Sequence, residues 1–311
     1  MDPTNDNGIE LDDTLINTIS DRFHGPGLRL VLAYGDLHQP VNVVTGDRTI
    51  NLFVVVDDEK ITEWHSNNLR RNPTDYGFIC RVLPEEYLKA FQRSATGLVT
   101  MPPTPLDPED EAGIYLSYSI ISFTALLDDL AHWTHSMAAA GPLLGAVHVI
   151  DGNEQTVAIL NEGLEKNRTA ALCAAMLTTT LPAALSVVLA KITTLVVSEG
   201  MQADSAFMLI SDMIPHFKPI AQKLGMDPDL PMELPVGDLL KHVPDIGLDI
   251  TMIEGLETGM RQALVAEAMR DLVNKNVFVQ FMKDVATGPF KRVVPFIGAS
   301  INRVLERLNF D

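Results

Sequence analysis

The stretch NLFVVVDDEKITEWHSNNLRRNPTDYGF, from Asn51 to Phe78, contains the pattern that decides the fold. It begins with a run of β-branched and aromatic residues, which is typical of a buried strand. Asp57 and Asp58 close this run, and a helical pattern follows as far as the break at Asn72-Pro73. The stretch therefore predicts a strand followed by a helix and a turn.

Residues on both sides continue this alternation of strands and helices. Similar β-branched runs predict further strands, and amphipathic or Pro-initiated segments predict further helices. Two Pro-rich and acidic stretches predict surface loops. The predicted strands are 28–35, 49–58, 113–122 and 145–150, the helices include 84–92 and 124–133, and the loops are 100–113 and 226–235.

From Gln155 onward helical patterns dominate. We therefore predict an α+β fold, with a mixed α/β domain over 1–153 and a mainly helical domain over 154–311. The uncharged segment 169–190 is long enough for a membrane span. It is nevertheless rich in Ala and Thr and interrupted by Pro182, so two buried helices are the preferred interpretation.

Composition limits the function classes. A formal charge of -18 argues against a general role on nucleic acid, which requires clustered Lys and Arg. The two cysteines, Cys80 and Cys173, have no partners at metal-ligand spacing and predict ordinary buried thiols in a reducing compartment. The acidic N-terminal segment shows neither a secretory signal nor a mitochondrial presequence.

The order of a strand, a Tyr-Gly turn and an acidic strand resembles the arrangement of nucleotidyltransferases. In such enzymes a turn holds the triphosphate, and carboxylates on the next strand hold Mg²⁺, because a cation bridging phosphates requires hard oxygen ligands. From this pattern alone, a generic pair of strands in an α/β protein is the preferred interpretation.

A more specific resemblance lies between Val54 and Phe78. This segment resembles the signature of the mitochondrial phosphatidate cytidylyltransferases, the translocator assembly and maintenance proteins that make CDP-diacylglycerol. Segments 112–133 and 161–182 resemble two further stretches of that family, so that the likeness covers about two thirds of the chain. The signature residues in register are Trp64, His65, Asn68, Leu69, Asn72, Pro73, Tyr76 and Phe78.

This resemblance implies a nucleotidyltransferase domain, then a helical domain of winged-helix type, and a C-terminal amphipathic helix that touches the mitochondrial inner membrane from the matrix. It also implies a Mg²⁺-dependent reaction of CTP with phosphatidic acid.

The chain departs from the family at positions that handle nucleotide or metal. The turn is Tyr34-Gly35-Asp36-Leu37, where the family has a Gly-Ser turn, so a carboxylate faces the place of the triphosphate. Asn51 stands where the family has Asp, and Ser117 where it has Lys. We therefore expect no catalytic residue, metal or cofactor; the vestigial positions are Gly35, Asp36, Asn51, Asp57, Asp58 and Ser117.

Three other features allow more than one interpretation. Asp57 and Asp58 could bind a cation, but ending the strand and capping the next helix is preferred. His65 is expected to be a hydrogen-bonded structural residue. His132 and His135, three positions apart on one predicted helix, could share a metal but lack a third ligand.

The segment 288–310 places apolar residues on one helical face and basic residues largely away from it. Such a helix suits either the headgroups of an anionic phospholipid membrane or packing within the protein. The candidate membrane contacts are Lys291, Arg292, Arg303 and Arg307.

Our leading hypothesis is a catalytically silent family member that serves as a subunit of a complex at the matrix face of the inner membrane, such as a respiratory complex or ATP synthase. One alternative is an active cytidylyltransferase in which Asp36, Asp57 and Asp58 hold Mg²⁺. Another is a module that binds phospholipid.

Overall fold

The computed structural model describes residues 11–35, 48–76, 81, 92–93, 97–106, 113–196 and 203–275. Several predictions fall outside these ranges. They concern Asp36, Cys80, most of the helix predicted over 84–92, and the C-terminal residues Lys291, Arg292, Arg303 and Arg307.

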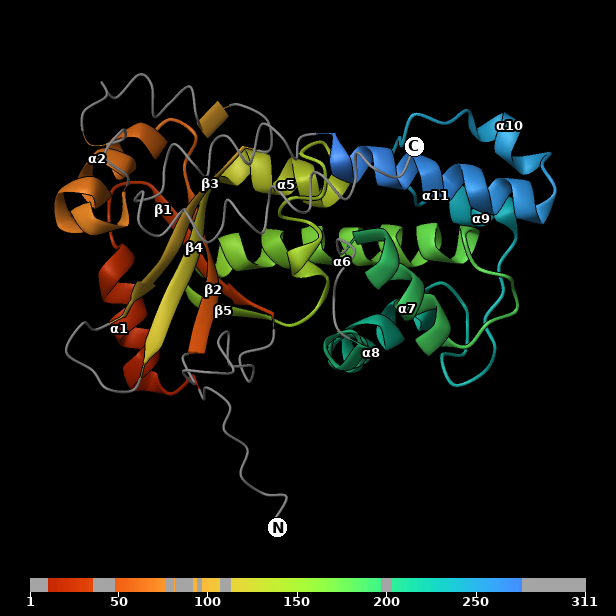
Figure 1. Cartoon of the computed structure of the whole chain (residues 1–311), viewed down its shortest axis with the longest axis horizontal. Coiled ribbons are helices and arrows are strands. Elements are labelled where there is room, and N and C mark those ends of the chain that lie inside the picture. The colour runs from red at the N-terminus through yellow and green to blue at the C-terminus, as the bar shows by residue number, and fades with distance from the viewer. Residues whose placement is uncertain are drawn as a thin grey trace, which may run out of the picture. The chain divides into compact units, whose positions relative to one another are not determined.

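A five-stranded sheet forms the first part of the chain (Figure 1). The strand order is β3-β4-β2-β1-β5; β2 and β4 are parallel, and the other neighbours are antiparallel. The sheet and its helices confirm the predicted α+β class and the four predicted strands. The bounds are β1 Leu28–Tyr34, β2 Arg48–Val56, β3 Leu98–Pro105, β4 Ile114–Ser122 and β5 Val147–Gly152.

Strand β3 was not predicted, and the loop expected over 100–113 was wrong in its first part. β3 contains three prolines, which argue against a central strand because proline has no N–H to donate. It lies at the edge of the sheet, where only one side needs partners. Its register with β4 shifts between Met101 and Thr104, where two of the prolines lie.

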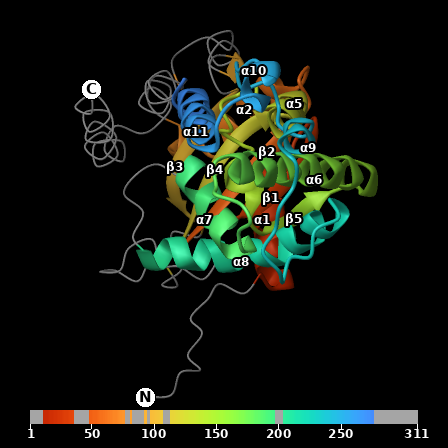
Figure 2. The ribbon, with the colours of Figure 1, turned by 90° about the vertical axis from the view of Figure 1, so that its right-hand side faces the viewer.

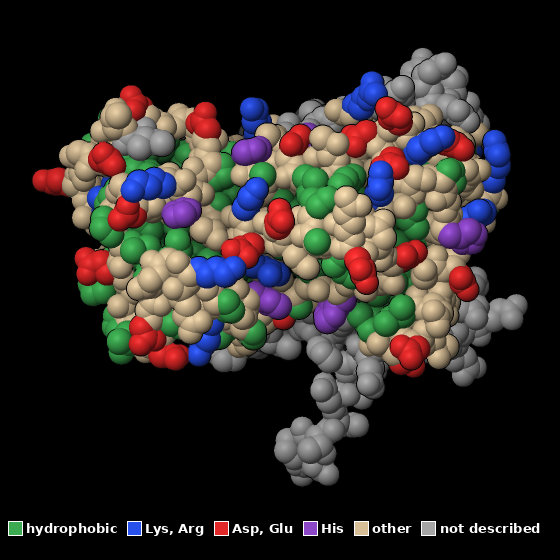
Figure 3. Space-filling model, turned by 180° about the vertical axis from the view of Figure 1, so that it is seen from behind, with side chains coloured by type: hydrophobic (Ala, Val, Ile, Leu, Met, Phe, Trp, Pro, Cys, Tyr) green, Lys and Arg blue, Asp and Glu red, His purple; other side chains and the backbone are tan. Residues whose placement is uncertain are grey.

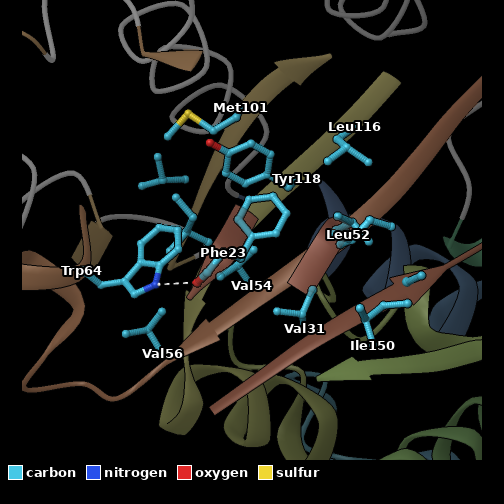
Figure 4. Close-up of a cluster of buried hydrophobic side chains, with 14 of the residues drawn as sticks. Phe23, Val31, Leu52, Val54, Val56, Trp64, Met101, Leu116, Tyr118 and Ile150 are labelled. Atoms are coloured by element: carbon cyan, nitrogen blue, oxygen red, sulfur yellow. Dashed lines mark hydrogen bonds between the residues drawn. The ribbon is translucent and has the colours of Figure 1, made fainter. Parts of the chain in front are cut away.

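One face of the sheet packs against helices α1 (Asp13–Phe23) and α2 (Ile61–Arg71). Alternate strand residues such as Val54 and Tyr118 meet Phe23 and Trp64 in a fully buried cluster (Figure 4). The Trp64 indole N–H also donates to the Phe23 carbonyl at 3.4 Å. Because side chains alternate along each strand, the residues between these apolar ones point to the opposite face of the sheet.

The remaining elements are mostly helical. α6 ends at Leu177 and α7 begins at Leu185, so segment 169–190 forms parts of two helices around Pro182, as predicted. Within the described ranges, no helix has the length and apolarity needed to cross a membrane. α7 packs beside α8 and contacts α11 (Figures 1 and 2). The bounds are α5 Phe123–His132, α6 Glu154–Leu177, α7 Leu185–Val196, α8 Ala203–Lys223, α9 Val236–Leu240, α10 Ile250–Glu254 and α11 Thr258–Asn274; short 3₁₀ helices cover Pro73–Asp75 and Pro142–Leu144.

The described residues divide into two compact units. The sheet unit comprises residues up to Leu126 together with Val147–Val157, and the helical unit comprises Leu127–Ala146 and Ala158–Lys275. The single boundary expected at residue 153 therefore differs from this division, because Leu127–Ala146 belong with the later helices. A functional division of the chain at that point stays a prediction.

Candidate functional site

Three of the predicted vestigial positions come together at one end of the sheet. Asn51 of β2 is the register partner of Ser117 on β4 and of Tyr34 on β1, and Gly35 follows Tyr34 directly. Neighbouring strands lie about 4.8 Å apart. We call Tyr34, Gly35, Asn51 and Ser117 the polar end of the sheet.

Asn51 and Ser117 lie on the face opposite α1 and α2. Their neighbours Leu52 and Leu116 belong to the buried cluster, and successive strand residues point to opposite faces. Both polar residues are partly exposed. Further along the same face, the hydroxyl groups of Ser119 and Thr100 lie 3.0 Å apart. The face therefore offers amide and hydroxyl groups from three adjacent strands.

Tyr34 and Gly35 shape the β1 side of the polar end. The Tyr34 ring stacks on Phe53 with centroids 4.6 Å apart and planes 20° apart. Burial raises the pKa of Tyr34 to about 12, so its phenol is neutral at physiological pH. Gly35 has φ +80°, and a Cβ there would meet no heavy atom within 4 Å. Backbone conformation rather than lack of space therefore favours glycine at this position.

The described part of the polar end carries no carboxylate. Strands β1 to β4 contain no Asp or Glu, and Asp151 of β5 accepts a hydrogen bond from Ser20 at 3.2 Å. The adjoining acid in the sequence, Asp36, lies outside the described residues. The side chains described here can donate and accept hydrogen bonds, but they offer Mg²⁺ only neutral oxygens.

Asp57 and Asp58 lie beyond the opposite end of β2. Asp57 follows Asn51 by six positions, which corresponds to roughly 20 Å along a strand. Asp57 forms an ion pair with Arg29. The two aspartates are therefore not part of the polar end.

Asp58 has a structural role that differs in detail from the predicted one. Its carboxylate accepts hydrogen bonds from Thr124 Oγ1 at 2.7 Å and Thr124 N at 3.3 Å, at the start of α5. Burial raises the pKa of Asp58, but hydrogen bonds from Thr124 and Ser122 outweigh it and lower the pKa overall. The expectation that it caps the next helix was wrong, because α2 starts after Lys60 without a side-chain cap.

The signature residues that the structure describes lie beneath the sheet rather than at its polar end, and Phe78 lies outside the described residues. His65 is 1% exposed; its Nε2 lies 3.0 Å from Gln92 Oε1 and its Nδ1 lies 3.1 Å from the Tyr76 hydroxyl. The Gln92 amide N–H groups donate to the carbonyls of Gly97 and Ile120. Gln92 Oε1 therefore accepts from His65 Nε2–H, and in the neutral imidazole Nδ1 accepts from the Tyr76 hydroxyl.

The same network continues to a buried ion pair. The Asn68 amide donates to the hydroxyls of Tyr76 and Tyr118, each at 3.1 Å, and Tyr118 donates to Asp75 at 2.7 Å. Arg22 Nη2 contacts both Asp75 oxygens, at 2.9 and 3.1 Å. Burial, with the neighbouring Tyr76 and Asp75, raises the pKa of Tyr118 well above its ordinary value.

Asn72 and Pro73 complete the signature. Asn72 donates to Asn68 Oδ1 at 2.8 Å, and Pro73 opens the 3₁₀ helix that carries Asp75. Sequence reasoning missed Arg22, Asp75 and Tyr118. The only available signal was the position of Asp75 inside the signature stretch, because its partners are distant in sequence.

Two features of the helical unit also bear on the predictions. His132 is the last residue of α5 and His135 lies in the turn that follows, so they do not share a helix as expected. Nowhere in the described ranges do three or more His, Cys, Asp or Glu side chains gather as metal ligands. Asp129, which sequence reasoning did not single out, accepts four backbone hydrogen bonds from residues 135–140.

The five-stranded mixed sheet and the helices that follow it define an α+β protein. A sequence model of the family described as mitochondrial phosphatidate cytidylyltransferase matches residues 16–195. This match covers more than half of the chain, and the chain belongs to this family.

Individual relatives agree with this assignment. The bovine mitochondrial phosphatidate cytidylyltransferase is 30% identical over 153 residues, which cover 48% of this chain and 42% of the relative. The Drosophila melanogaster enzyme is 26% identical over 155 residues, 50% of this chain and 43% of the relative. The chain thus matches less than half the length of these relatives.

Among solved structures, a nucleotidyltransferase-like protein from Exiguobacterium sibiricum aligns with 85% of this chain and 74% of its own length. Its sequence identity is 11% and its TM-score 0.26, so the alignment carries no argument about function.

Proposed function

We propose that this chain is a non-catalytic member of the mitochondrial phosphatidate cytidylyltransferase family that serves as a structural subunit of a complex at the matrix face of the inner membrane. A respiratory complex or ATP synthase is the setting we favour. The observation that carries the proposal is the convergence of Gly35, Asn51 and Ser117 at a polar end whose described side chains include no carboxylate.

The chemistry of Mg²⁺ and triphosphate supports this proposal. Mg²⁺ is bound through one or two carboxylates in addition to substrate phosphates, and Asn51 supplies only a neutral amide oxygen. Ser117 supplies no cation to balance phosphate charge. The packed face beneath the sheet keeps a buried hydrogen-bond network through His65, Asn68 and Tyr118. A packed interior beside a polar end with no described carboxylate is what a retained scaffold with abandoned chemistry predicts.

An active Mg²⁺-dependent CTP:phosphatidate cytidylyltransferase is the second candidate. Family membership favours it, and so does the open space beside Gly35, where a substrate group could approach the backbone. In this case Asp57 and Asp58 would not share an ion with groups at the polar end, because they lie beyond the other end of β2. Asp36, which follows Gly35 in the sequence and lies outside the described residues, would then have to supply the carboxylate for the metal.

A phospholipid-binding module, in which a former phosphatidate pocket survives without CTP, is the remaining proposal. Anionic phospholipid at Lys291, Arg292, Arg303 and Arg307 is a separate proposal, supported by the basic charge of these residues. All four lie outside the described ranges.

The decisive experiment is calorimetric titration of the full-length protein with CTP and Mg²⁺. We expect no measurable binding by the native sequence, because no described carboxylate at the polar end can hold the metal. The double substitution Asn51→Asp with Ser117→Lys should restore binding, since it returns an anion for the metal and a cation for the phosphates.

The matched control is Asp57→Asn with Asp58→Asn, which should not alter the result because these residues lie at the other end of β2. Micromolar binding by the native sequence that disappears without Mg²⁺ and depends on Asp36 would instead establish the enzymatic candidate.

A further inference from the structure

Arginine side chains hold the ends of α1 and α2 together in the sheet unit. Arg22, in the last turn of α1, contacts both carboxylate oxygens of Asp75, at 2.9 and 3.1 Å, and Asp75 lies in the turn that follows α2. Arg71, the last residue of α2, donates to the carbonyl of His24, which follows α1 directly. Both guanidinium groups are therefore held at the junction of the two helices.

A third arginine reaches this junction from a later part of the chain. Arg81 donates through Nε to the carbonyl of Tyr76 at 3.0 Å. Tyr76 is the residue after Asp75, the partner of Arg22. We call Arg22, Arg71 and Arg81 the arginine cluster. Its three members are joined by hydrogen bonds to the end of α1 and to the turn 73–76.

The charge of the arginine cluster is only partly balanced. Arg22 and Asp75 form an ion pair. Arg71 and Arg81 are exposed and donate to backbone carbonyls, and within the part of the chain that the structure describes no acidic side chain pairs with either of them. A guanidinium group has five N–H donors, so both side chains can bind a further acceptor.

An exposed arginine alone does not mark a site in this protein. On the face shown in Figure 3, basic side chains are scattered among acidic ones. The arginine cluster differs because hydrogen bonds hold two unpaired cations at one junction. It also contrasts with the formal charge of -18 of the whole chain. An anionic group is therefore repelled by the protein as a whole and attracted locally by the cluster.

We propose that the arginine cluster binds an acidic segment of a partner protein. Guanidinium groups match carboxylates through paired N–H donors, and arginine clusters commonly recognise acidic motifs. A broad anionic membrane would also meet the acidic remainder of the protein. The exposed large hydrophobic side chains of the described residues all lie outside α1, α2 and the turn 73–76, so they would not anchor the cluster in a membrane. This inference rests on the proposed role as a subunit, and it specifies the chemistry of the partner.

The test uses the full-length protein and a flexible peptide of Glu and Ser, about 12 residues long, that carries an uncharged fluorescent dye. Fluorescence anisotropy at about 150 mM salt limits attraction between distant charges, because the Debye length is then about 8 Å. We expect saturable binding of the Glu peptide. A peptide with Gln in place of Glu should bind at least about tenfold more weakly.

The double substitution Arg71→Gln with Arg81→Gln should weaken binding of the Glu peptide by about tenfold, because it removes two charged donors. Each single substitution should weaken binding by about threefold, and the single variants decide the test if the double variant does not fold. The matched control is Lys166→Gln with Arg270→Gln, which removes the same charge from two exposed residues of the helical unit. The control should change affinity by less than about twofold.

Equal binding of the Glu and Gln peptides, or an equal effect of the cluster and control substitutions, would overturn the proposal. It would also be overturned if the cluster substitutions left peptide binding unchanged and instead abolished binding to phosphatidylglycerol vesicles or self-association. None of these measurements involves CTP, so a failure here is distinct from a failure of the proposed non-catalytic role.

Discussion

The hydroxyl group of Tyr118 joins the buried ion pair to the rest of the signature network. It accepts from Asn68 and donates to Asp75, whose charge is balanced by Arg22. Both Asp75 carboxylate oxygens are buried, so water does not replace a hydrogen bond that they lose. The signature residue Asn68 therefore helps to position the Tyr118 hydroxyl that donates to the buried Asp75 carboxylate.

We predict that Tyr118→Phe lowers the free energy of unfolding by about 1–3 kcal/mol, because Asp75 loses a donor and an Asn68 N–H loses its acceptor. Urea unfolding followed by circular dichroism measures this change. Tyr115→Phe on the same strand is the control, since Tyr115 is partly exposed. Its effect should stay within about 0.5 kcal/mol. Equal unfolding midpoints for the two variants would contradict the prediction.

At the scale of the secondary-structure element, the turn after α5 depends on one carboxylate, that of Asp129. Trp133, Ser136 and Met137 have φ values of 55°, 63° and 56°, which are costly for residues other than glycine. Asp129 accepts hydrogen bonds from the backbone N–H groups of residues 135, 137, 139 and 140, at 2.9 to 3.2 Å. Burial raises the pKa of Asp129 in spite of these bonds. The carboxylate thus compensates for an unfavourable backbone path.

Asp129→Asn should cost about 2 kcal/mol or more of unfolding free energy, because an amide presents one acceptor oxygen where the carboxylate presents two. The adjacent Asp128→Asn is a close control, since Asp128 is exposed. Hydrogen exchange of residues 135–140 should speed up only in the Asp129 variant. Unchanged protection there would show that other contacts hold the turn.

At the scale of the whole molecule, local periodicity was enough to predict four strands and the helices around Pro182. It could not predict features whose decisive contacts are distant in sequence. Arg22 and Asp75 are 53 positions apart, and β3 is a strand only because β4 supplies its partners. The residues of the polar end were individually predictable from the family resemblance. That they lie side by side on neighbouring strands could be known only from the sheet register.

The division into two units also depends on contacts between residues distant in sequence. It leads to a prediction about fragments of the chain. Trp133 Nε1 donates to Asn167 at 2.9 Å, Arg168 donates to the Leu144 carbonyl at 3.1 Å, and the Ala146 N–H donates to Asp212 at 2.9 Å. A fragment of residues 127–275 keeps these bonds, whereas one of residues 154–275 loses them.

We therefore expect the longer fragment to unfold cooperatively on heating and the shorter one to lose its cooperative transition. Circular dichroism and calorimetry distinguish these outcomes. Equal melting of the two fragments would mean that Leu127–Ala146 are dispensable for the helices.

The placement of the Trp-His signature on the underside of the sheet affects how relatives of this chain are recognised. A search keyed to that signature collects every descendant that preserves the interior lining, whether or not the opposite face still performs chemistry. Under the proposed function, working and silent members of the family would differ at the positions of Asn51 and Ser117 rather than in the signature. Presence of the signature would then indicate common ancestry without indicating activity.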